Sequence, residues 1–257
     1  MKLLSLEAYL ASVNGAAGIT EELEASFVKE MHAFIQQLVM KHNLSTNEMG
    51  ISMHLFHVYT KHVPYTEFDR TMLASVCLYL ACKIDYIHIR MADIMQHYHE
   101  NRKGPKKRKP FEEVKDQLTS DFTALEIKVL KLIEFDFDFQ LPFDSLRVYR
   151  DNRLLGEASL LSRVKARGGN EELYTRAIVK FYETAKRVAF YSYLLDLCLY
   201  FPASVLAGAA LLIADRAFCE QPFEGDYANG REYLRSALGI ESFTESPEAL
   251  SFDVPLT

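Results

Sequence analysis

One apolar segment occurs twice in this sequence, at positions 133 residues apart. Met72–Ile84 reads MLASVCLYLACKI, and Val205–Ala217 reads VLAGAALLIADRA. The copies share leucine or alanine at four equivalent positions, and each has a basic residue in its penultimate place, Lys83 in the first and Arg216 in the second. The repeats of solenoid proteins recur about every 20 to 50 residues. The displacement here is much longer than such a repeat and predicts two copies of one helical domain.

Each copy also carries small residues along one helix face. They stand at positions i, i+3 and i+7 and are Ala74, Cys77, Ala81 in the first copy and Ala207, Ala210, Ala214 in the second. Small side chains let the backbones of neighbouring helices approach closely. We therefore expect each copy to be the central helix of its domain.

Helical periodicity of apolar residues extends along most of the chain and predicts an all-α fold with two five-helix domains and short flanking helices. The expected helices span about 4–12, 24–41, 47–62, 69–84, 90–99, 119–134, 143–153, 171–191, 202–219 and 230–238. Period-2 alternation is confined to Phe135, Phe137 and Phe139. That short pattern predicts an extended crossover and not a sheet.

The composition is that of a compact globular protein, with 49% hydrophobic and 25% charged residues. No uncharged apolar run reaches the roughly 20 residues of a membrane span, and the first residues lack a signal-peptide cleavage site, so we expect an intracellular protein. The four cysteines, Cys77, Cys82, Cys198 and Cys219, lie in apolar stretches without metal-site spacing. We interpret them as buried, reduced thiols.

The formal net charge is −6, and the basic residues are unevenly distributed. Residues 102–109 hold six lysines and arginines and no acid; without those six, 23 basic residues face 35 acidic ones, a balance of −12. A surface of that sign repels phosphate backbones, so direct nucleic-acid binding is not expected.

No motif in the chain points to catalysis, a cofactor or a metal. The sequence contains no Gly-rich phosphate loop, no Gly-x-Ser-x-Gly turn and no His-Glu-x-x-His. His54 and His57 could share a helix face, but no nearby cysteine or carboxylate completes a tetrahedral ligand set. We interpret these histidines as structural or surface residues.

Several motifs together resemble the cyclin family. They are LYLACKID at the end of the first repeat, LEIKVLKLIEFDF at Leu125–Phe137, the Leu141-Pro142-Phe143 entry to the second half, and LCLYFPASVL at Leu197–Leu206. The resemblance covers about residues 24–240 and implies tandem cyclin boxes. It divides the chain into an N-terminal helix and connection (1–23), a first box (24–140), an inter-box segment (141–170), a second box (171–240) and a C-terminal tail (241–257).

The resemblance implies that the chain is not an enzyme but the activating subunit of a cyclin-dependent kinase, with which it forms a heterodimer. Lys83 and Glu126 match the pair that cyclins present to the kinase's mobile regulatory helix. From the residues alone, Lys83 could equally be a cation stabilised at a helix C-terminus, and Glu126 a solvated helix residue. Apolar residues that cyclins place around the pair match Leu80, Ile84, Leu130 and Phe135, whose alternative is an ordinary core role.

The kind of cyclin is indicated by what the sequence lacks. Cell-cycle cyclins recruit substrates through a sequence motif, the recruitment word, on the first helix of the first box, and this motif contains an arginine and is followed by a tryptophan. Here Met31–Ile35 reads MHAFI and the chain has no tryptophan. The similarity is instead to transcription-type cyclins, whose kinases act on the RNA polymerase II tail or on other kinases. A cell-cycle cyclin and a non-activating scaffold like the general transcription factors of this fold stay open as alternatives.

A basic word, Lys106-Lys107-Arg108-Lys109, is flanked by Pro105 and Pro110 and is expected to lie in an exposed loop. It is similar to a nuclear import signal, and its alternatives are a solvated loop or a loop that meets an acidic partner. We predict a nuclear location, with the cytoplasm also open.

Overall fold

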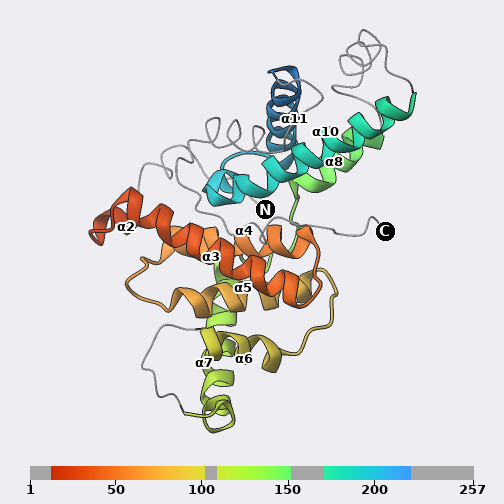
Figure 1. The fold of residues 1–257 in the computed structure, drawn as a ribbon. Helices are drawn as coiled ribbons and strands as arrows, with labels where there is room; N and C mark the ends of the chain where they lie inside the picture. Colours follow the sequence, from red (N-terminus) through yellow and green to blue (C-terminus); the bar gives the residue numbers. More distant parts are fainter. Residues whose placement is uncertain (1–12, 102–108, 152–170, 221–257) are drawn as a thin grey trace.

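The computed structural model describes residues 13–101, 109–151 and 171–220, and all regular structure in them is helical (Figure 1). This confirms the all-α class. The first group of helices comprises α2 (Val13–Ala16), α3 (Glu21–Lys41), α4 (Thr46–His62), α5 (Arg70–Ile84), α6 (Met91–Asn101) and α7 (Phe111–Leu132). The second comprises α8 (Pro142–Asp151), α10 (Glu171–Tyr191), the 3₁₀ helices η1 (Ser192–Leu194) and η2 (Asp196–Leu199), and α11 (Ala203–Glu220).

Side-chain caps determine where three helices of the first group begin. Thr20 and Asp69 accept backbone N–H groups at the starts of α3 and α5. At the start of α4, Ser45 and Glu48 form a capping box, in which the side chain of each residue accepts a hydrogen bond from the backbone N–H of the other. These helices begin within three residues of the expected positions.

The start of α7 was predicted wrongly. The helix begins at Phe111, not near residue 119, and Glu112 and Glu113 occupy its first turn. Pro110 before the helix and acids in its first turn are ordinary start signals, because they suit the unpaired N–H groups there. Residues 111–118 were left out of the expected helix because they follow the basic run and include four charged residues. The helices expected at 4–12 and 230–238 lie outside the described residues.

The first repeat forms the centre of the first group, as expected. Helix α5 contacts α3, α4, α6 and α7, and the side chains of Ala74, Cys77 and Ala81 are fully buried. Close backbone approach on several sides is what small residues permit. The prediction of a central helix is therefore confirmed for this copy.

The second repeat forms α11, which packs on α8, α10 and η2 through the buried residues Ala207, Ala210 and Ala214. Equivalent positions of the repeat are thus buried in both copies. Helix α8 falls in the expected inter-box segment, yet its most extensive contacts are with α10 and α11, while Phe143 at its start lies against α4 and η1. Its packing groups residues 142–151 with the second set of helices, while the division into boxes stays a prediction.

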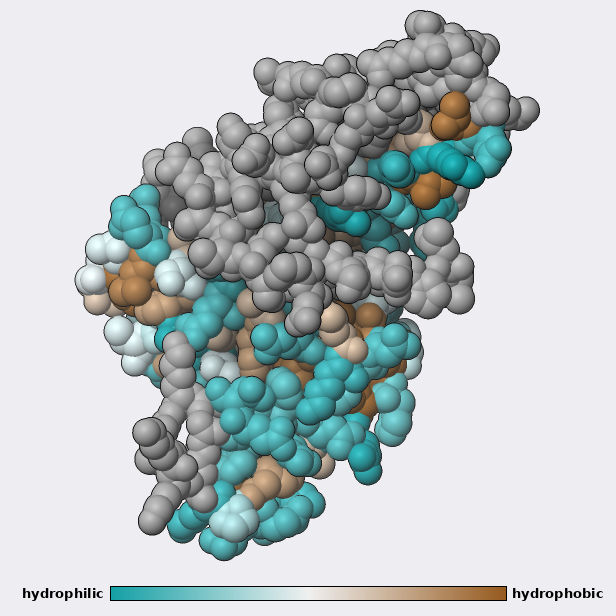
Figure 2. Space-filling view, in the orientation of Figure 1, coloured by the Kyte–Doolittle hydropathy of each residue, from teal (hydrophilic) through white to brown (hydrophobic). Residues whose placement is uncertain are grey.

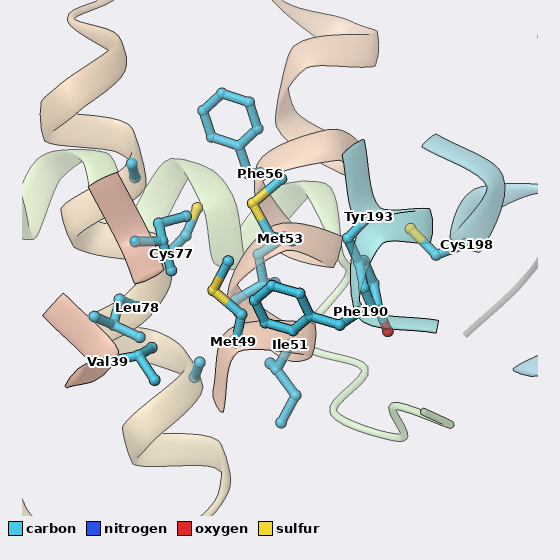
Figure 3. Packing of buried hydrophobic residues seen from close by; sticks show 14 of the residues in the cluster. Val39, Met49, Ile51, Met53, Phe56, Cys77, Leu78, Phe190, Tyr193 and Cys198 are labelled. Atoms are coloured by element: carbon cyan, nitrogen blue, oxygen red, sulfur yellow. The ribbon is translucent and has the colours of Figure 1, made fainter. Parts of the chain in front are cut away.

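The two groups of helices share a continuous core around α4. Figure 3 shows Met49, Ile51 and Met53 of α4 close to Phe190 and Tyr193 from the end of α10 and η1. A hydrogen bond of 2.9 Å joins His57 Nε2 to the Tyr193 carbonyl oxygen, and Lys61 pairs with Asp196 at 2.5 Å. Hydrophobic burial and these polar links hold the groups together.

The described cysteines are buried and free, as the sequence predicts. Burial raises the pKa of the thiols of Cys77, Cys82 and Cys198, that of Cys82 to about 12, so they stay protonated and unreactive. The side chain of Cys219 lies outside the described part of the chain.

The surface is mixed in character. On the face shown in Figure 2, hydrophilic side chains cover most of the coloured area, with smaller hydrophobic patches between them. Among the residues that the structure describes, no helix has the length and hydropathy needed to cross a membrane.

Candidate functional site

Lys83 and Glu126 lie side by side, although 43 positions separate them in the sequence. Helix α5 carries Lys83 in its last turn, α7 packs against α5, and Lys83 Nζ stands 2.5 Å from Glu126 Oε1. The lysine side chain is 51% exposed, whereas that of the glutamate is only 9% exposed. The pair therefore consists of an accessible cation held by a buried carboxylate.

Burial of Glu126 excludes the interpretation of that residue as solvated. A carboxylate out of water is costly unless it is paired, and Lys83 provides the pairing charge. The Lys83 ammonium also lies 5.1 Å from the ring centroid of Tyr79, one turn earlier on α5, within cation–π distance. Both contacts limit where the ammonium can point.

The end of α5 presents an exposed aromatic residue. Tyr86 adopts a left-handed backbone with φ of 59°, and hydrogen bonds from Tyr86 N to Lys83 O and from Ile87 N to Cys82 O close the helix. Glycine usually fills such a position because a side chain strains it. Here a tyrosine does so and is 96% exposed.

The end of α7 is built in the same way. Glu134 and Phe135 have φ of 52° and 56°, and hydrogen bonds run from Glu134 N to Lys131 O and from Phe135 N to Leu130 O. Phe135 is 56% exposed as a result. Strained non-glycine residues cluster at functional sites. Their occurrence at the ends of both helices that carry the pair therefore favours a functional site there.

The four apolar residues that were expected around the Lys83–Glu126 pair are divided between the core and the surface. Leu80 is buried, Ile84 and Leu130 are half-buried against the core, and Phe135 is exposed. Leu80 therefore has the core role that was its alternative.

Sequence reasoning missed four further residues on these segments: Tyr79, Tyr86, Ile127 and Phe137. The last three are exposed. Ile127 was detectable as the neighbour of Glu126, and Phe137 from the alternation after α7. Nothing in the sequence pattern indicated that Tyr86 would face solvent.

Other sequence features fall elsewhere. Lys106, Lys107 and Arg108 lie outside the described residues; the Lys109 carbonyl oxygen is 3.0 Å from His99 Nε2. Met31 and Ile35 of the recruitment-like word are buried, so they offer no surface.

His54 and His57 of α4 are buried and have structural roles. Burial is the largest influence on both and lowers the pKa of His57 and that of His54, the latter to about 3. Neither belongs to a group of potential metal ligands within the described ranges.

These features define an all-helical protein in which the packed helices α5 and α7 hold a charged pair beside exposed apolar residues, an arrangement suited to binding another protein. The family model "Cyclin, N-terminal domain" matches residues 3–138, more than half of the chain. The chain belongs to the cyclin family.

Three solved structures contain chains of similar fold. A chain of the yeast RNA Pol II CTD kinase CTDK-1 complex has a TM-score of 0.63 at 14% identity, covering 93% of this chain and 72% of its own. A chain of the yeast TFIIK (Kin28/Ccl1/Tfb3) complex has a TM-score of 0.59 at 17% identity, and the match covers 93% of this chain and 96% of that one. A chain of the Chaetomium thermophilum CAK complex bound to ATP-gamma-S has a TM-score of 0.56 at 16% identity, and the match covers 87% of this chain and 59% of that one. Identities this low show a common fold, and a search of curated proteins found no match.

Proposed function

We propose that this chain binds and activates a cyclin-dependent kinase through the surface centred on Lys83 and Glu126. The observation that carries the proposal is the asymmetry of the pair: a half-exposed ammonium fixed by a buried carboxylate between two solvent-facing helix ends. In this proposal the catalytic groups belong to the kinase. The effect of this chain is on the conformation of the kinase.

The chemistry of the pair suits recognition of a partner's backbone. An ammonium has three donors, and in the described structure Lys83 directs one to Glu126 Oε1. The others can donate to backbone carbonyl oxygens, and the carboxylate can accept a backbone N–H, in charge-assisted bonds about twice as strong as neutral ones. Bonds of this type to the kinase's regulatory helix would hold it where the kinase's own Lys–Glu pair forms.

The apolar residues around the pair supply the remaining binding energy. Tyr86, Ile127, Phe135 and Phe137 are exposed on the segments that carry or follow the pair. Burying large apolar side chains around a desolvated charged group is the usual anatomy of an energetic hot spot. We expect these side chains to become buried in the heterodimer.

We further propose that the kinase acts in transcription and that the complex is nuclear. Similarity to chains from an RNA Pol II CTD kinase, TFIIK and a CAK complex supports this class. The missing arginine and tryptophan of the recruitment word argue in the same direction.

The double variant Lys83→Ala/Glu126→Ala tests the site. Loss of a hot spot costs about 2 kcal/mol or more, so we expect kinase affinity to fall at least about 30-fold and activation to be abolished. The measurements are binding to the co-purifying kinase by calorimetry and its phosphorylation rate. Full activation by a folded double variant would refute the site.

A matched control is the variant Glu112→Ala/Lys115→Ala. This ion pair of 3.5 Å lies on the same helix, near its other end, so the control removes the same charges. It should activate normally. Circular dichroism and thermal unfolding of both variants separate loss of binding from loss of folding.

A further inference from the structure

A pocket of about 320 Å³ lies between the end of α3 and the connection from α5 to α6. His42 and Leu44 line it from the α3 side, and residues 87–90 with Asp93 line it from the other. Its size is near the lower limit of ligand sites in proteins, enough for one or two side chains of a bound peptide. None of these residues belongs to the Lys83–Glu126 pair.

Two similar helix ends create the apolar part of the pocket. After α3, Asn43 adopts φ of 52° and Leu44 N donates to Val39 O at 2.9 Å; after α5, Tyr86 is left-handed and Ile87 N donates to Cys82 O at 2.7 Å. In both motifs the residue after the left-handed one folds back toward its helix. Leu44 and Ile87 consequently line the same pocket.

The polar part has an anchored guanidinium. Arg90 Nε and Nη2 each donate to Asp93 at 2.9 Å, which fixes the plane of the guanidinium. A guanidinium has five N–H donors, so three remain, and the Arg90 side chain is largely exposed. An oriented, accessible arginine is well suited to binding a carboxylate or phosphate.

Further positive potential comes from the end of α3. Burial, and then the Lys41 ammonium, lower the pKa of both His42 and His97, and Lys41 Nζ lies 3.2 Å from His97 Nδ1. Lys41 directly precedes the lining residue His42, so its ammonium adds positive charge near the edge of the pocket. The ring nitrogen Nε2 of His42 is shielded from solvent and has no hydrogen-bond partner among the described residues.

We propose that this pocket is a docking site for an acidic peptide segment of a partner protein, with an aliphatic side chain beside a carboxylate. Leu44 and Ile87 would contact the aliphatic group, and Arg90 would bind the carboxylate in the field of Lys41. The lining holds one arginine and one aspartate, which pair with each other, and Lys41 directly precedes the lining residue His42, whereas the whole chain carries a net charge of −6. The pocket is thus less negative than the chain as a whole, and the free donors of Arg90 favour an anionic ligand there.

Fluorescence anisotropy with the free, full-length chain tests the proposal without any kinase. The probe is a labelled peptide of alternating leucine and glutamate, compared with versions in which glutamine or phosphoserine replaces glutamate. We expect the glutamate peptide to bind, the glutamine peptide not to bind, and Arg90→Glu to weaken binding at least about tenfold. Lys41→Glu should weaken it too.

The control variant is Arg147→Glu. Arg147 also pairs with an aspartate three residues away, Asp144 at 3.2 Å, but on α8. It should bind the peptide like the unmodified chain. Peptide addition should also shift the NMR ring signals of His42 and His88 and leave those of the buried His54 and His57 unchanged.

Four results would overturn the proposal: no binding of the glutamate peptide at millimolar concentration, equal binding of the glutamine peptide, equal weakening by Arg90→Glu and Arg147→Glu, or binding of the phosphoserine peptide alone. The last would show a phosphate site in place of a carboxylate site. Circular dichroism of each variant establishes that it is folded.

Discussion

His32 projects from α3 against the end of α10, where its ring stands 4.9 Å from that of Phe190 and 6.3 Å from that of Tyr191. Burial lowers the pKa of His32 from 6.5 to about 4. The folded protein thus holds a neutral imidazole at a pH where the unfolded chain would bind a proton. Its contribution to stability is complete above pH 6.5 and is lost as the pH falls toward 4.

We predict that the free energy of unfolding decreases between pH 6.5 and 4, and that His32→Gln makes this decrease shallower. A shift of that size corresponds to about 3 kcal/mol at full protonation, because one pKa unit is about 1.4 kcal/mol. Urea unfolding at pH 7, 5.5 and 4.5 gives the slopes. His54 and His57 add to the slope in both proteins, so equal slopes would contradict the assignment to His32.

Asp85, at the end of α5, has the opposite linkage. A hydrogen bond with Glu48, followed by partial burial, raises the pKa of Asp85 to about 6. The folded state holds this proton more tightly than the unfolded chain, so stability falls as the pH rises from 3.8 through 6. Asp85→Asn should therefore be more stable than the unmodified chain at pH 7.5 and lose that advantage at pH 4. Calorimetric melting at both pH values measures this, and an advantage equal at both would disprove it.

The roles of individual residues were only partly predictable from the sequence. The types and helical placement of Lys83 and Glu126 were visible, and the cyclin resemblance singled them out. Their 2.5 Å contact depends on how α5 packs on α7, which local periodicity does not determine. Exposure of Tyr86 depends on a left-handed turn that a glycine would normally signal.

At the scale of elements, the helix α4 packs tightly at Gly50. A Cβ atom there would lie 3.1 Å from Phe143 and 3.2 Å from both Leu141 and the Tyr193 hydroxyl, all of them buried. A Cβ atom added to Gly208 on α11 would have no neighbouring atom within 4 Å. The two glycines therefore form a matched pair for one substitution.

We predict opposite effects of alanine at these two sites. Alanine gains up to about 1 kcal/mol in helix propensity over glycine, but overpacking costs about 1 to 3 kcal/mol. Gly50→Ala should lower the free energy of unfolding by about 1 kcal/mol, and Gly208→Ala should raise it by up to about that amount. Urea unfolding measures both, and a stabilising Gly50→Ala would show that the contact between the two groups of helices is loose.

Most elements were predictable because helical periodicity and caps act locally. The misplaced start of α7 had a local cause too, since its polar first turn directly follows the basic run at 102–109 and lacks the apolar periodicity of the rest of the helix. Packing of α8 on α10 and α11 was not predictable, because its short pattern does not reveal which neighbours cover it.

At the scale of the whole molecule, the repeat was the strongest information in the sequence. Small residues at equivalent positions of α5 and α11 are buried in both, which ties the repeat to packing. The shared core at α4 packs one group of helices against the other, so the proposed kinase-binding surface on α5 and α7 stands on a continuous core. Activation by such a surface needs rigidity, because it must hold a mobile element of the partner.

Affinity purification from the source cell, followed by mass spectrometry, tests the central claim most directly. We predict that a cyclin-dependent kinase co-purifies with the unmodified chain and with Glu112→Ala/Lys115→Ala, and that it is lost with Lys83→Ala/Glu126→Ala. Recovery of no kinase, or equal recovery of a kinase with all three proteins, would contradict the account.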